Sequence, residues 1–154
     1  MDTHWSPKPL GEAACPLLST VFPYHPRYDD RSVVVAVPSG FHETREGTNI
    51  IVHFHGHMND NLGVLERYGM PQALTQQKIN ALLVLPQGPY RARDSSGEKM
   101  EEDGGLKALV DDVLTTMKKE DTVKTTRLNK VIVSAHSGGY WLVEQALQER
   151  LLPC

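Results

Sequence analysis

The sequence predicts an α/β fold in which a mostly parallel sheet is flanked by helices. Apolar, β-branched runs alternate with segments whose apolar residues recur every three or four positions. This order of strands and helices is typical of a parallel sheet whose connections cross over its faces. No internal repeat or low-complexity tract interrupts the pattern, and 154 residues is the length of about one domain.

The composition is that of a globular protein, with 40% hydrophobic and 23% charged residues. Basic residues number 16 and acidic residues 19, which argues against nucleic acid as a partner, because its binders carry a basic surplus. No apolar run reaches the ~18 residues that would predict a membrane span. The first residues lack a basic region followed by an apolar stretch, so we expect no signal peptide and favour a cytoplasmic location.

The N-terminal part predicts an irregular arm followed by two strands. Residues 1–31 are rich in proline and aromatic residues and are compatible with at most a short edge strand. Residues 32–38, SVVVAVP, predict a strand that ends in a turn, and residues 50–55, IIVHFH, predict a second. The loop between them is too short for a crossover helix, so we expect a hairpin-like antiparallel pair.

The next elements alternate helix and strand. Residues 60–78 have helically spaced apolar residues around Pro71, which predicts one interrupted helix or two short ones. Residues 81–86, ALLVLP, are typical of a strand buried on both faces. The long polar loop over 87–104 should leave the carboxyl edge of the sheet, where open α/β folds place their ligands.

The C-terminal part predicts a helix, a strand and a second helix. From Leu106 to Met117 apolar residues recur at three- and four-residue steps, with Asp111 and Asp112 expected on the exposed face. Residues 130–135, KVIVSA, predict a strand. A helix follows the glycines after Ser137, and Pro153 ends it.

A serine lies at the turn between this last strand and the helix, in the segment VIVSAHSGGY over 131–140. Small neighbours permit a sharp turn that lifts the hydroxyl of Ser137 clear of the sheet. The N–H of Gly138, at a helix N-terminus, could then stabilise an oxyanion. An ordinary turn with a serine cap is the alternative. The segment Ala135-His136-Ser137-Gly138-Gly139 resembles the nucleophile elbow, Gly-x-Ser-x-Gly, of the α/β-hydrolase family.

A second motif, HFHGHMN over 53–59, supports the same resemblance. In α/β-hydrolases a His-Gly pair at the end of the strand before the first helix shapes the other half of the oxyanion hole. The resemblance extends over about residues 32–150 and implies that the backbones of Gly138 and of His57 or Met58 are the oxyanion donors. It implies that the following residues shape the site: His55, Gly56, His136, Gly139 and Tyr140.

The family's acid and base have no counterpart at their usual positions. They follow the nucleophile in chain order, yet only 17 residues follow Ser137 and none is Asp or His. We therefore expect a partial α/β-hydrolase domain over 32–154 that lacks the C-terminal strands and ends after the elbow helix. The N-terminal half of a longer hydrolase is the favoured origin. The alternatives are a short variant that borrows His57, His136 or a partner's residues, and an inactive remnant.

The predicted function is a serine hydrolase with Ser137 as nucleophile, which cleaves a small-molecule ester or amide, most plainly a carboxylic ester, through an acyl-enzyme without a cofactor. The sheet edge left exposed by the missing strands favours a homo-oligomer. One alternative is an inactive half-domain that acts as a binding module. Another is a zinc hydrolase that uses His53, His55 and His57, but no second histidine cluster completes such a site, so we expect no metal.

Overall fold

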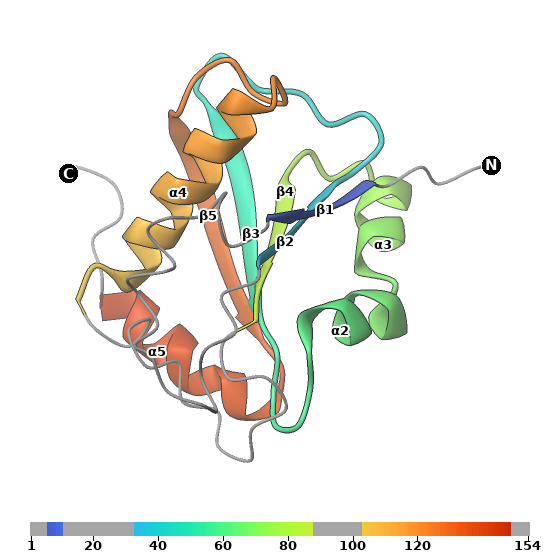
Figure 1. Ribbon diagram of the computed structural model, residues 1–154, viewed down its shortest axis with the longest axis vertical. Coiled ribbons are helices and arrows are strands. Elements are labelled where there is room, and N and C mark those ends of the chain that lie inside the picture. Colours follow the sequence, from blue (N-terminus) through green and yellow to red (C-terminus); the bar gives the residue numbers. More distant parts are fainter. Residues whose placement is uncertain (1–5, 11–32, 88–102, 149–154) are drawn as a thin grey trace.

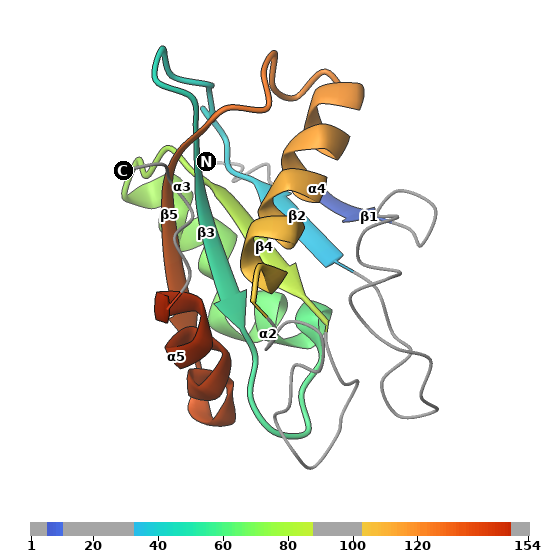
Figure 2. The same cartoon turned by 90° about the vertical axis from the view of Figure 1, so that its left-hand side faces the viewer.

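The computed structural model describes residues 6–10, 33–87 and 103–148 (Figures 1 and 2). The strands are β1 (Ser6–Leu10), β2 (Val33–Val37), β3 (Thr48–Phe54), β4 (Leu82–Pro86) and β5 (Leu128–Ala135). The helices are α2 (Asn61–Tyr68), α3 (Met70–Gln76), α4 (Gly105–Lys119) and α5 (Tyr140–Gln148), with a short 3-10 helix at Ser137–Gly139. None of the helices in these ranges has the length and apolar character that a membrane crossing requires.

The strands form one mixed sheet in the order β1-β2-β4-β3-β5, which confirms the α/β class. Strands β4, β3 and β5 are parallel, whereas β1 and β2 pair antiparallel at one side. The hairpin-like pairing expected for 32–38 with 50–55 is wrong, because β4 lies between β2 and β3. Every residue of β4 is buried, and a strand buried on both faces belongs inside the sheet.

Helices lie on both faces of the sheet (Figure 1), and each face has an apolar core beneath them. Helices α4 and α5 pack on one face through residues such as Leu109, Val113 and Leu142. Helices α2 and α3 pack on the other through Leu65 and Leu74. Successive residues of each inner strand serve opposite cores, as the alternation of side chains along a strand requires. The turn after β5 therefore starts from a sheet that is supported on both sides.

The predicted helices are confirmed where the structure describes them. Residues 60–78 form two short helices, and Gly69, with φ of 55°, ends α2 and begins α3. In α4 the apolar stripe is buried and Asp111 is exposed, but Asp112 is buried, contrary to expectation. The side chains of consecutive helical residues differ by about 100° in direction, so Asp111 and Asp112 cannot both lie at the centre of the exposed face.

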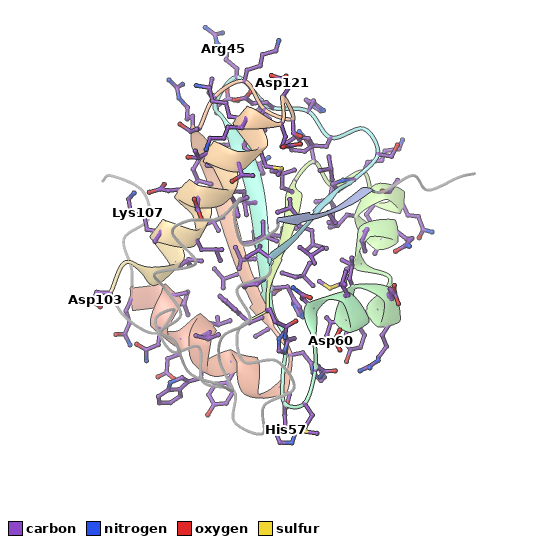
Figure 3. All side chains as sticks on the ribbon, viewed as in Figure 1. Arg45, His57, Asp60, Asp103, Lys107 and Asp121 are labelled. Atoms are coloured by element: carbon purple, nitrogen blue, oxygen red, sulfur yellow. The ribbon has the colours of Figure 1, made fainter. Side chains whose placement is uncertain are left out.

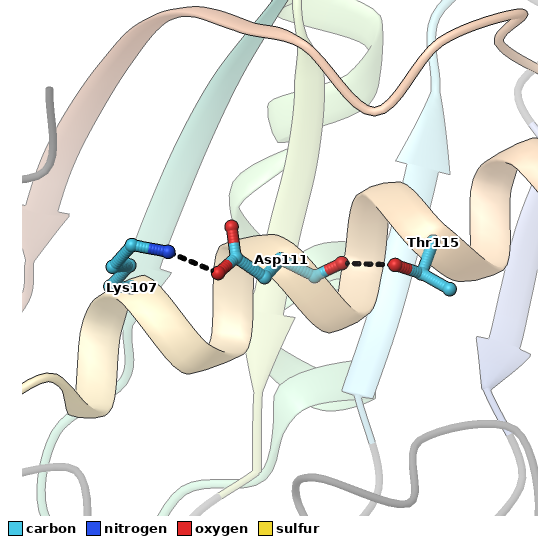
Figure 4. A network of polar contacts seen from close by, with 3 residues as sticks. All are labelled: Lys107, Asp111 and Thr115. Atoms are coloured by element: carbon cyan, nitrogen blue, oxygen red, sulfur yellow. Dashed lines mark hydrogen bonds and ion pairs between the residues drawn. The ribbon is translucent and has the colours of Figure 1, made fainter.

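Polar contacts along the exposed side of α4 are local (Figure 4). Lys107 forms an ion pair with Asp111 one turn later, and the hydroxyl of Thr115 donates to the Asp111 carbonyl at 2.8 Å. An exposed pair of this spacing contributes about 0.5 kcal/mol or less to helix stability. The position of α4 is therefore determined by its buried stripe.

Strand β5 lies at one edge of the sheet and β1 at the other. Within the described residues, β5 pairs only with β3. Its Ile132 side chain lies in register with Ile51, on the face that α2 and α3 cover, yet it is 58% exposed. Strand β1 lies within the predicted N-terminal arm; the remainder of that arm, most of the loop over 87–104 and the C-terminal Pro153 fall outside the described residues.

Candidate active site

Ser137 occupies a strained turn at the carboxyl end of β5. The backbone is extended at His136, with φ of −117° and ψ of 135°, and then turns sharply, since Ser137 has φ of 52°. A residue with a β-carbon rarely adopts this left-handed conformation, which costs about 1–2 kcal/mol. The side chain of Ser137 is exposed, and its hydroxyl makes no hydrogen bond to the described residues. The turn thus presents an accessible hydroxyl beyond the sheet.

Gly139 allows this turn to lie directly against the end of β3. A methyl group at Gly139 would lie 2.7 Å from the carbonyl oxygen of Phe54 and 2.9 Å from that of His55. The N–H of His136 also donates to the Phe54 carbonyl at 3.1 Å. Since real β-carbons do not approach backbone oxygens so closely, only glycine fits at 139 without displacing a strand.

Gly56 makes the second close contact, between the loop after β3 and the serine itself. A methyl group at Gly56 would lie 2.9 Å from the β-carbon of Ser137 and 2.7 Å from the carbonyl oxygen of His136. The two motifs that the sequence singled out are therefore in contact. Within the loop, the N–H of Asn59 donates to the Gly56 carbonyl at 3.3 Å, and Met58 has φ of 57°.

The predicted oxyanion donors lie on the two sides of this contact. Gly138 is in the first turn of the 3-10 helix, where backbone N–H groups lack partners within the helix. His57 and Met58 are exposed at the tip of the turn that Gly56 begins, and Figure 3 shows His57 at the extreme end of the molecule. Tyr140 is exposed too, and its ring packs edge-on against that of Trp141 at 6.3 Å.

A buried polar network, missed by the sequence analysis, supports this loop. Gln87 and Asn61 are almost fully buried, and the Gln87 side-chain oxygen accepts from the N–H of Asn61 at 3.0 Å. The Nε2 atom of His55 contacts both the carbonyl oxygen of Gln87 and, at 3.1 Å, its side-chain nitrogen. These contacts join the end of β4, the loop and the start of α2. A polar residue directly after the apolar run 81–86 was the available signal.

The two alternating histidines contact different strands. His53 bonds through Nδ1 to the hydroxyl of Ser134 on β5 at 2.9 Å, whereas His55 contacts Gln87 after β4. The ring of His136 lies 5.6 Å from that of Tyr68 on α2. No group of three histidine, cysteine or acidic residues in the described ranges is arranged to hold a metal ion. The zinc alternative therefore gains no support from this geometry.

The side chain of His53 is buried, with 8% of its surface exposed, and its Nε2 atom has no hydrogen-bond partner among the described residues. Burial lowers the pKa of His53 below its ordinary value of 6.5, and the neighbouring His136 and His55 lower it further. The folded chain therefore keeps His53 neutral at a pH at which the unfolded chain protonates it.

This difference predicts a pH-dependent stability. Below about pH 6.5 the unfolded state binds the His53 proton and the folded state does not, so the free energy of unfolding falls as the pH decreases. His53→Gln should weaken this fall, whereas Ser39→Ala, an exposed substitution that removes no titratable group, should not. Urea unfolding at about pH 7.5 and about pH 5.5 measures it. Parallel pH profiles of the wild type and His53→Gln would contradict the prediction.

No family model matches this chain, and no curated protein is significantly similar to it.

Proposed function

We propose that the chain is a serine hydrolase of the α/β-hydrolase type that attacks small carboxylic esters through Ser137. The observation that carries this proposal is the φ of 52° at an exposed serine on a strand-to-helix turn. A serine that only caps a helix does not need this conformation, because capping residues are usually extended. Backbone strain at a solvent-facing nucleophile is typical of functional turns.

The proposed chemistry is acyl transfer. The Ser137 oxygen attacks the ester carbonyl, the alcohol leaves with a proton, and the acyl group stays on the serine until water removes it. The oxyanion formed during attack would accept hydrogen bonds from the N–H of Gly138 and from the backbone of the 57–58 turn. The contact of Gly56 with Ser137 supports this arrangement, because it brings the two halves of the predicted oxyanion hole to one place.

The general base is not in contact with Ser137 among the described residues, because no hydrogen bond there links its hydroxyl to a histidine. His136 is next in sequence, but its ring lies against Tyr68 on α2. Since loss of the base removes several powers of ten in rate while the oxyanion hole retains part of the acceleration, we propose slow acylation and slower turnover for this chain.

Fluorophosphonate labelling tests the proposal. The probe bonds to an activated serine oxygen with loss of fluoride, and peptide mapping by mass spectrometry locates the adduct. We expect slow modification at Ser137 alone, approaching one adduct per chain on long incubation, and none in Ser137→Ala. Three outcomes would contradict the proposed nucleophile and favour the binding-module alternative. They are adducts spread over several surface residues, equal labelling of native and denatured samples, and no adduct at all.

We also infer self-association through β5. A two-fold antiparallel pairing centred on Ile132 would extend the sheet, place Lys130 opposite Ser134 of the second copy and bring no like charges together. Sedimentation velocity should detect a dimer that Ile132→Lys dissociates. Ile79→Lys, at a position 43% exposed and outside β5, should leave it intact. A monomeric wild-type chain, or equal effects of both variants, would contradict the inference.

A further inference from the structure

A hollow of about 550 Å³ lies between residues 42–45 and 121–127. These segments precede β3 and β5, so the hollow is at the amino ends of the strands, whereas Ser137 follows the carboxyl end of β5. Figure 3 shows this separation, with Arg45 and Asp121 at one end of the molecule and His57 at the other. The hollow is therefore distinct from the candidate active site.

The backbone around the hollow is held by hydrogen bonds. Thr44 and Gly47 exchange two backbone bonds of 3.1 Å, which closes a tight turn with Arg45 near its tip. The N–H of Thr48 donates to the carbonyl of Arg127 at 2.9 Å. The Arg127 side chain passes directly over Gly47, where a β-carbon would lie 3.0 Å from its Cγ. The positions of Arg45 and Arg127 are thus linked through a few short contacts.

Glu43 joins the two segments that line the hollow. Its carboxylate accepts hydrogen bonds from the N–H groups of Lys124 at 2.7 Å and Thr125 at 3.2 Å, and from the Thr125 hydroxyl. The Thr125 hydroxyl bond is the main reason why the pKa of Glu43 is lowered; slight burial opposes it, and the two N–H bonds and the Lys124 charge support it. The donors to this carboxylate are therefore Lys124 and Thr125, and the arginines do not bind it.

The arginines have no such partners. Arg45 and Arg127 are exposed, and neither guanidinium forms a hydrogen bond or ion pair with the described residues. Lys124 adds a third cation at the same hollow, and Asp121 is the remaining acidic residue there. The whole chain has a net charge of −3, so three cations around one hollow are a local reversal of its charge.

We propose that this hollow binds a small phosphate-bearing anion. A guanidinium presents N–H donors in a planar fork that matches a phosphate group, and two unpaired forks can hold adjacent oxygens of one group. Lys124 adds charge without demanding a fixed geometry. The size suits a small organic phosphate, because ligand cavities usually measure about 300–1,000 Å³. Asp121 weakens the site by repulsion and thereby provides a specific test.

Isothermal titration with inorganic phosphate and with glycerol phosphate, at constant ionic strength, tests the proposal. We expect saturable binding in the millimolar range or tighter, which Arg45→Gln or Arg127→Gln weakens about tenfold, as loss of one charge-assisted contact implies. Asp121→Asn should tighten it severalfold by removing the repulsive charge. Lys107→Gln, an exposed cation on α4, is the matched control and should change nothing.

The ligands distinguish the outcomes. Tighter binding of glycerol phosphate assigns the site to an organic phosphate, and equal binding assigns it to the phosphate group alone. No saturable heat with either ligand, or equal losses in Lys107→Gln and Arg127→Gln, would overturn the proposal. Tighter binding of a single-stranded oligonucleotide, with a steep salt dependence, would overturn the assignment to a small molecule.

Discussion

Ser137→Ala is expected to abolish the acylation burst with a small activated ester. The burst disappears completely because no acyl-enzyme can form without the hydroxyl, whereas the oxyanion hole retains part of the slow hydrolysis. The fold should persist, since the side chain is exposed and its hydroxyl has no bond to the described residues. Release of nitrophenol from nitrophenyl acetate and circular dichroism measure the two effects.

A matched series makes this result specific. Ser137→Gly should be equally inactive yet more stable by about 1 kcal/mol, because glycine adopts the φ of 52° without strain. Ser39→Ala, in the exposed turn after β2, is the activity control. Ser134→Ala is a poorer control because it removes the partner of His53. A wild-type acylation burst in a folded Ser137→Ala protein would refute the nucleophile assignment.

Gly139→Ala is expected to lower the free energy of unfolding by about 3 kcal/mol, at the upper end of overpacking effects. Its methyl group would meet two backbone oxygens of β3 at 2.7 and 2.9 Å, and backbone of a central strand cannot move away as a flexible side chain could. Urea unfolding monitored by circular dichroism gives the change.

Gly40→Ala is the control that distinguishes the cost of a steric contact from the cost of an unfavourable backbone conformation. Gly40 has φ of 84° but open space where a methyl group would lie, so the substitution introduces conformational strain alone, about 1 kcal/mol. A similar loss in both variants would mean that the turn and β3 separate easily. In that case the close packing of the elbow against β3 would not be what holds Ser137 in place.

Local sequence patterns were sufficient to predict the helices and strands but not which strands pair with each other. The stripe from Leu106 to Met117 predicted α4, and the run 81–86 predicted a strand buried on both faces, because each pattern reports its own burial. The loop length between β2 and β3 could not reveal that a later strand enters between them. The strained turn at Ser137 follows from small residues that are adjacent in sequence.

The remaining parts of the site depend on contacts between distant residues. Gln87 and Asn61 are 26 positions apart, and their bond exists only because the end of β4 meets the start of α2. Similarly, regular alternation would put His53 and His55 on one side of their strand. However, the chain leaves β3 after Phe54, so His55 contacts Gln87 while His53 bonds to Ser134. Alternation predicts direction only within a regular strand.

The insertion of β4 between β2 and β3 has a consequence for how the chain acquires its structure during synthesis. Until residue 86 has emerged, β2 and β3 each lack the neighbour that they share in the finished sheet. Parallel and non-local strand pairing is slow, because loop closure precedes the gain from contacts. Nascent chains would therefore expose two valine- and isoleucine-rich strands for seconds at ordinary translation rates, the interval in which a chaperone would bind them.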